Sequence, residues 1–315
     1  MNRRTFLNGL MATSCLTAFQ SVAASPLARL ATSPSTNGLG AGNFDENLVV
    51  FISDLHCNPE GYQPDHLRKV VNRILNLPVL PRNVIAFGDL AYLTGKVSEY
   101  EFLKPILKPL EDAGITLTLG MGNHDHRARF AQVFPEQAAK TKLQGRYVYI
   151  VETPHADFIL LDSLQESEDP TTWITPGALN EEQKQWLEQT LKNYTKPVFV
   201  GSHHPLNEVG ISDILVKSPT CCGYIYGHNH RWQKHWIKLS YGSQRIVRAM
   251  CLPSTGHWGD IGFVTFSLDG KKAVAVNNQS EFFFPQPASP ADSPAQWQYI
   301  TEENNGDQCT FTYTI

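Results

Sequence analysis

Six short apolar runs alternate with helical stretches between residues 48 and 226, and this alternation constrains the fold more than any other feature of the sequence. Each run has the length of a buried strand. Between them, residues 65–76 and 180–192 repeat apolar side chains at helical spacing. Strands that alternate with helices indicate an α/β fold with an at least partly parallel sheet. The predicted strands are residues 48–52, 84–87, 115–119, 158–161, 198–200 and 224–226.

The pattern changes after Lys234. Four further apolar runs follow one another without a helical stretch between them, so we predict that they pair antiparallel. We expect one domain over residues 47–315, with a C-terminal extension from about residue 280. A flexible lead-in over residues 25–46, rich in small and polar residues, would precede it. The late strands are predicted at residues 236–239, 246–250, 262–266 and 273–276, with a closing strand at 310–314.

The first 24 residues have the order of an export signal. Arg3 and Arg4 precede Phe6 and Leu7, a weakly apolar stretch follows, and small residues end it. The paired arginines resemble a bacterial twin-arginine signal; an ordinary secretory signal is the alternative. The apolar stretch is shorter than the ~20 residues that a membrane span needs. We therefore expect export by the twin-arginine machinery to the periplasm or beyond, with no membrane span in the mature protein.

Bulk charge and cysteine content narrow the function only slightly. The net charge of −4 leaves no overall basic surface, so nucleic acid is not an expected partner. Six cysteines are present, of which Cys15 would leave with the signal. The remaining odd, irregularly spaced set is not a disulfide framework, and no Cys-x-x-Cys pair indicates a zinc ribbon. We expect these cysteines to be mainly structural, with at most one unassigned disulfide.

Five of the predicted strands end in side chains that can bind metals. One Asp or His at a strand end is ordinary loop chemistry, but five such loops in order are not. Because ligands in α/β folds bind beyond the carboxyl ends of strands, we expect the loops to converge. In chain order they are Asp54-Leu55-His56, Gly88-Asp89, Gly122-Asn123-His124-Asp125, His203-His204-Pro205 and Gly227-His228-Asn229-His230.

This order of motifs resembles the calcineurin-like metallophosphoesterase superfamily. Residues 122–130 and 203–205 are most similar to its bacterial class III cyclic-nucleotide phosphodiesterase branch. The resemblance covers about residues 48–266. It implies a four-layer αββα sandwich of two mixed sheets flanked by helices. It also implies hydrolysis of a small-molecule phosphate diester or monoester by a hydroxide that bridges two metals.

The resemblance assigns a role to each motif residue. Asp89 would bridge two divalent or trivalent transition metal ions, and this mixed donor set suits Fe, Mn or Zn. His124 would act as general acid or cationic donor toward the leaving-group oxygen, and Asp125 would orient it. The first metal would be held by Asp54, His56 and His230, and the second by Asn123, His203 and His228.

Two alternative functions remain open at this stage. Tyr92 stands where purple acid phosphatases have a tyrosine ligand, but His56 is present, so we expect His56 to be the ligand and Tyr92 to lie behind it. A purple-acid-type phosphomonoesterase is thus one alternative. A metal- or phosphate-binding protein without turnover is the other, and the pairing of His124 with Asp125 argues against it.

A second group of residues could contact substrate, although each has an equally ordinary structural interpretation. These candidates are Arg127, His204, His257 and Trp258. We interpret His66, His155 and His235 as surface residues.

Overall fold

The computed structural model describes residues 43–238, 246–284 and 308–312. The predicted signal at residues 1–24 and nearly all of the lead-in lie outside these residues. Strand β1 (Phe44–Ile52) begins three residues before the predicted domain start. Within the described parts of the chain, no helix is long and apolar enough to cross a membrane.

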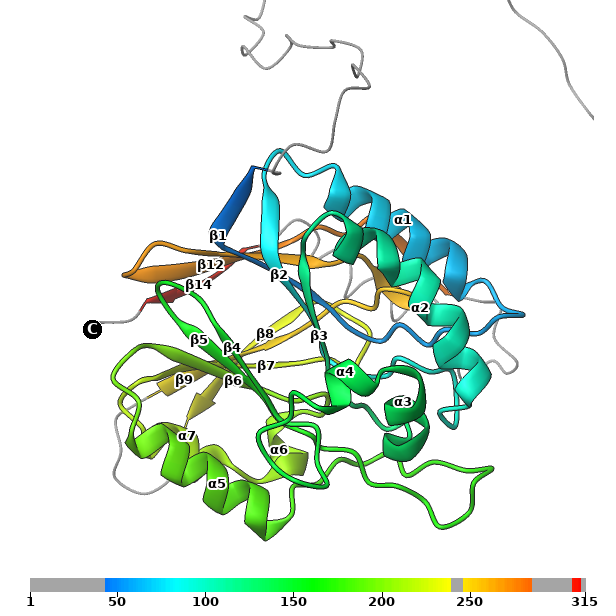
Figure 1. The fold of residues 1–315 in the computed structure, drawn as a ribbon. Coiled ribbons are helices and arrows are strands. Elements are labelled where there is room, and N and C mark those ends of the chain that lie inside the picture. The colour runs from blue at the N-terminus through cyan, green and yellow to red at the C-terminus, as the bar shows by residue number, and fades with distance from the viewer. Residues whose placement is uncertain (1–42, 239–245, 285–307, 313–315) are drawn as a thin grey trace, which may run out of the picture. The chain divides into compact units, whose positions relative to one another are not determined.

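The first of two large sheets contains both ends of the domain (Figure 1). β1, β2 (Leu80–Ala86) and β3 (Thr116–Leu119) run parallel. On the other side of β1, antiparallel neighbours are added by β11 (Val264–Leu268), β12 (Lys272–Asn277) and β14 (Gln308–Thr312). Part of the predicted C-terminal extension therefore forms an edge of this sheet. The strand order is β14, β12, β11, β1, β2 and β3.

The second large sheet is also mixed. Its four central strands run parallel, and the strand at each edge is antiparallel to its neighbour. The prediction that all strands after Lys234 pair antiparallel is therefore wrong for β9, which lies parallel to β7. The order is β4 (Tyr149–Glu152), β5 (Asp157–Leu160), β6 (Val198–Gly201), β7 (Cys221–Tyr226), β9 (Ile246–Cys251) and β8 (Gln233–Lys238). A separate antiparallel pair joins β10 (Gly259–Ile261) to β13 (Glu281–Phe283).

Helices cover the outer face of each sheet, as Figure 1 shows. Apolar side chains of α1 (Gln63–Leu75) and α2 (Val97–Asp112) pack on the first sheet. On the second sheet the covering helices are α5 (Glu181–Lys192), α6 (Leu206–Val209) and α7 (Ser212–Lys217). The short helices α3 (Arg127–Val133) and α4 (Pro135–Ala138) lie between β3 and β4 in sequence. This is the predicted four-layer sandwich.

The two faces of each central strand explain why the layers form. Successive side chains of a strand point to opposite faces. In β1, Val50 and Ile52 pack toward α1 and α2, while Val49 and Phe51 pack between the sheets. In β6, Phe199 faces the space between the sheets while its neighbours face the outer helices. Strands buried on both faces have the continuous apolar sequence from which they were predicted.

Candidate metal centre

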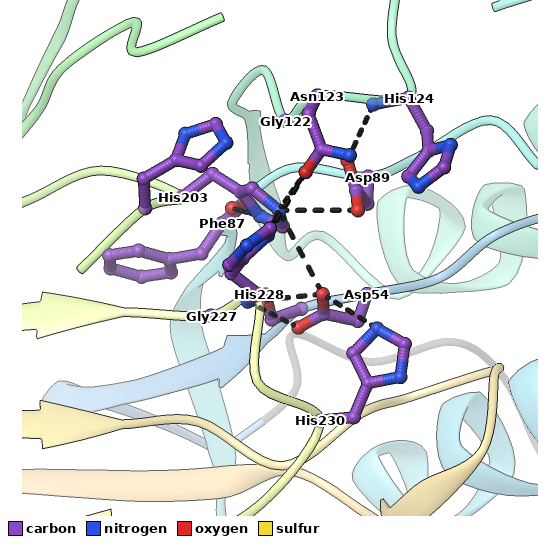
Figure 2. Close-up of polar contacts among 12 residues, drawn as sticks. Asp54, Phe87, Asp89, Gly122, Asn123, His124, His203, Gly227, His228 and His230 are labelled. Atoms are coloured by element: carbon purple, nitrogen blue, oxygen red, sulfur yellow. Dashed lines mark hydrogen bonds and ion pairs between the residues drawn. The ribbon is translucent and has the colours of Figure 1, made fainter. Parts of the chain in front are cut away.

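The five predicted loops meet at one end of the two sheets. Asp54 and Asp89 follow β1 and β2 of the first sheet, whereas His203 and His228 follow β6 and β7 of the second. Figure 2 shows their side chains and those of Asn123 and His230 gathered around a shared centre. The structure thus brings together side chains that are up to 176 positions apart in sequence, as for Asp54 and His230.

The backbone of these loops is strained where the ligands stand. Among the described residues, five that are not glycine have φ between 43° and 70°, the left-handed region. Such positions cost on the order of 1–3 kcal/mol each and cluster at functional sites. All five are predicted metal ligands: Asp54, His56, Asp89, His228 and His230.

The residues assigned to the first metal lie in mutual contact. Nε2 of His56 is 3.2 Å from Nε2 of His230, and the latter is 3.3 Å from Oδ1 of Asp54. The Nδ1–H of His56 donates to the carbonyl of Tyr92 over 3.1 Å. Because Nδ1 carries the proton, the neutral ring presents the lone pair of Nε2 to the centre. Burial lowers the pKa of His56, which favours this metal-binding form.

The residues assigned to the second metal form a matching group. Oδ1 of Asn123 lies 3.2 Å from Nε2 of His203 and 3.0 Å from Nδ1 of His228. The Nδ1–H of His203 donates to the carbonyl of Phe87 over 2.9 Å, so this ring too directs Nε2 inward.

Asp89 lies between the two groups, as a bridging ligand must. Its Oδ2 is 3.3 Å from Nε2 of His56 and 3.2 Å from Nε2 of His203. Its other oxygen accepts the backbone N–H of His124 at 2.8 Å.

The chemistry of this donor set fits metal ions. Asp54 is fully buried and Asp89 is 2% exposed. Buried carboxylates are costly without a compensating cation. Nε2 of His56 also faces Nε2 of His230 at 3.2 Å, and two imidazole lone pairs at that distance repel unless a proton or a cation lies between them. Groups of potential ligand atoms lie within 4.8 Å of one another, including Asp54 with His56 and His230, and Asp54 with Asp89 and His203.

His124 stands beside this centre, but Asp125 does not hold it. The Nδ1–H of His124 donates to the carbonyl of Leu93 over 2.9 Å. The expected contact between Asp125 and His124 is thus replaced by one that sequence could not reveal. A His124 nitrogen lies within 4.8 Å of the ligand atoms of His56 and Asp89, so the ring can reach a group bound there.

Asp125 instead ties together the backbone of two ligand loops. Its carboxylate accepts N–H groups of Leu90, Ala91 and Gly122 at 2.9–3.2 Å, and the hydroxyl of Tyr100 at 3.0 Å. Burial and the charge of Asp89 raise the pKa of Asp125 to about 7, and the backbone donors oppose that rise. Asp125 therefore positions the loops that carry Asp89 and Asn123.

Two of the candidate substrate residues are fully engaged within the protein. The guanidinium of Arg127 contacts Asp162 at 2.7 Å and Glu166 at 2.8 Å. Both ring nitrogens of buried His204 are also used, by the hydroxyl of Ser163 at 2.7 Å and the carbonyl of Thr175 at 3.0 Å. Burial lowers the pKa of His204 to about 2, so it is neutral.

The other two candidates lie against the histidines assigned to the first metal. The ring of His257 lies 4.4 Å from that of His56, and its Nδ1 contacts the hydroxyl of Tyr62 at 3.0 Å. The ring of Trp258 lies 4.3 Å from that of His230. A role for His257 and Trp258 in substrate binding stays a prediction.

The three histidines predicted to lie on the surface differ in outcome. The prediction that His66 is a surface residue is wrong: it is 5% exposed and its Nδ1–H donates to the carbonyl of Gly256. His155 is half-buried, and the side chain of His235 lies outside the described part of the structure. Among the described cysteines, Cys57 and Cys251 are buried free thiols.

Fold and centre together define a metal-dependent phosphoester hydrolase. The family model of the calcineurin-like phosphoesterases matches residues 48–232, more than half of the chain. The chain therefore belongs to the calcineurin-like phosphoesterase family and is a phosphoric ester hydrolase.

Solved structures support the fold. A dimetal phosphatase from Danio rerio superposes with a TM-score of 0.60 at 17% identity, covering 87% of this chain and 100% of its own. PhoD superposes with a TM-score of 0.55 at 11% identity, covering 82% of this chain and 76% of its own. No curated protein matches the sequence.

Proposed function

We propose that the protein is a dinuclear phosphodiesterase in which His56, and not Tyr92, serves as a ligand. The orientation of His56 carries this proposal. Its Nδ1–H is held by the carbonyl of Tyr92, which leaves Nε2 facing Asp89 and His230. A purple-acid-type site would place the tyrosine side chain in that role. Bound Fe, Mn or Zn would supply Lewis-acid activation of water and stabilise charge on the phosphoryl oxygens.

The preference for a diester rests on Arg127. A monoester dianion carries one more negative charge than a diester and gains more from a nearby guanidinium. Arg127 is the arginine that follows the His124 motif most closely, but Asp162 and Glu166 neutralise it. A singly charged diester suits these surroundings better.

His124 serves as the proton donor to the leaving-group oxygen in the proposed reaction. Water oxygen adds to phosphorus, the bond between phosphorus and the leaving-group oxygen breaks, and that oxygen takes a proton. His124 can donate this proton from Nε2 when its ring is protonated, because Nδ1–H is fixed on Leu93. The carbonyl thus sets both the tautomer and the direction of the ring.

A comparison of matched esters tests this function. Metal-loaded enzyme should hydrolyse bis-p-nitrophenyl phosphate with a higher kcat/KM than p-nitrophenyl phosphate. Cyclic AMP is assayed as well, as a phosphodiester without an activated leaving group. A preference for the monoester at acid pH, together with a coloured iron protein, would replace this proposal with the purple-acid alternative.

We further propose that the enzyme works outside the cytoplasm, on the basis of the paired Arg3 and Arg4. Replacing both with lysine in the full-length chain should leave the protein in the cytoplasmic fraction of a bacterial host. Export of the variant at the original level would contradict the twin-arginine route.

A further inference from the structure

The exposed apolar surface of the described residues gathers beside His124. Only three large hydrophobic side chains there are more than about a third exposed: Leu93 at 36%, Trp173 at 40% and Ile174 at 37%. The carbonyl of Leu93 holds the ring of His124, and the ring of Trp173 lies 4.8 Å from it. Ile174 follows Trp173 in sequence. Large apolar side chains left in water beside a reactive group are typical of binding sites.

The segment that carries Trp173 is fastened at both ends to the metal centre's own loops. At its start, Glu166 pairs with Arg127, two residues after Asp125. At its end, the carbonyl of Thr175 contacts Nε2 of His204, the neighbour of His203. Trp173 is therefore held in place relative to the catalytic groups.

The contact between the rings of Trp173 and His124 is tilted, and it lies on the side of the leaving group. The indole and imidazole planes meet at 42°, so the indole lies against the ring without covering it in a parallel stack. In the proposed reaction His124 protonates the leaving-group oxygen, so the group attached to that oxygen lies on the His124 side, where Trp173 contacts the His124 ring. The retained part of the diester lies on the metal side.

We propose that Trp173 determines specificity by binding an aromatic leaving group, so that the substrate is a phosphodiester with an aromatic ring next to the scissile oxygen. This inference rests on the proposed function, because it assumes that His124 faces the leaving group. Indole presents a large flat apolar surface, and stacking of a base on an aromatic side chain changes affinity by roughly 5- to 150-fold on substitution with alanine.

One mixed diester, benzyl methyl phosphate, tests the proposal by internal competition. The enzyme can release either benzyl alcohol or methanol from it, and the two alcohols have similar acidity, so His124 assists both equally. We expect metal-loaded wild-type enzyme to release mainly benzyl alcohol, as measured by proton NMR of the products. Trp173→Ala should lower the ratio of benzyl alcohol to methanol roughly tenfold, while Trp173→Phe should retain most of it.

A matched control lies in the same segment. Glu168→Ala changes an exposed side chain and should leave the product ratio at the wild-type value. A purely structural role for Trp173 would change the total rate and not the ratio, so an unchanged ratio in Trp173→Ala overturns the proposal. A wild-type preference for methanol release overturns it as well. If wild-type enzyme hydrolyses monoesters but not this diester, the proposed function itself fails.

Discussion

Asp125→Asn is the substitution that best separates the structural account of Asp125 from the expectation that it orients His124. Asparagine keeps one oxygen and can still accept from Leu90, Ala91 and Tyr100. Its amide nitrogen, however, replaces the oxygen that accepts the N–H of Gly122 at 2.9 Å. Two donors would then face each other in a buried position.

The cost follows from that one lost acceptor. Leaving a buried donor unpaired costs about 1–3 kcal/mol of unfolding free energy. A domain of 150–250 residues loses about 2–4 °C of Tm per kcal/mol, so we expect Tm of the metal-free protein to fall by about 2–12 °C. Calorimetry of the chelator-treated protein measures this shift. Asp112→Asn, at an exposed ion pair with Lys108, is the control and should change stability by less than about 0.5 kcal/mol.

The pH dependence of turnover then decides between the two roles. If Asp125 oriented His124, the variant would keep its Tm and its kcat profile would shift along the pH axis. An unchanged Tm would refute the assignment of Asp125 as the group that ties the loops of Asp89 and Asn123 together.

Three further substitutions address the acid, the ligand loops and the fold. His124→Ala should keep its metals by elemental analysis but lose about 10²- to 10⁴-fold in kcat, the usual contribution of a general acid; unchanged kcat would remove His124 from catalysis. Gly122→Ala would drive a methyl group into the carboxylate of Asp89, so we expect loss of bound metal in the purified protein, and full metal content would contradict that contact. Asn180→Ala removes the side chain that caps α5 through the N–H of Gln183 and should lower the unfolding free energy by about 1 kcal/mol in urea titrations, with metal content as the control.

The central strands and two helices were predictable because their sequence patterns repeat. β1 and β6 bury both faces, which requires an unbroken apolar run. α5 is marked at its start by Asn180, whose side chain accepts the N–H of Gln183. In contrast, α2 was missed: Pro105 and Pro109 lie inside it, and proline normally argues against a helix interior. Burial of Tyr100 and Leu103 against the first sheet outweighs that local cost.

The predicted ligand residues share a simple property: each lies at the end of a buried strand, so their meeting follows from the topology of the sheets. The groups that hydrogen-bond to the histidine rings do not follow from strand ends in this way. The ring nitrogens of His56, His203 and His124 contact the carbonyls of Tyr92, Phe87 and Leu93, and a backbone carbonyl leaves no trace in sequence. For the same reason Asp125 was assigned to its neighbour His124.

The position of Trp173 was equally unpredictable. It lies in a segment without regular secondary structure, and its contact with His124 depends on anchors at Glu166 and Thr175. The unusual density of Asp, Asn and His at strand ends, in contrast, was visible in the sequence. The left-handed backbone at five of those positions is its structural counterpart.

The most direct test of the central claim is the number of metal ions bound per chain, measured by elemental analysis alongside hydrolysis of bis-p-nitrophenyl phosphate. We predict two transition metal ions per active chain, loss of hydrolysis on chelation, and recovery when Fe, Mn or Zn is restored. Hydrolysis that persists in protein shown to be free of metal would contradict the account.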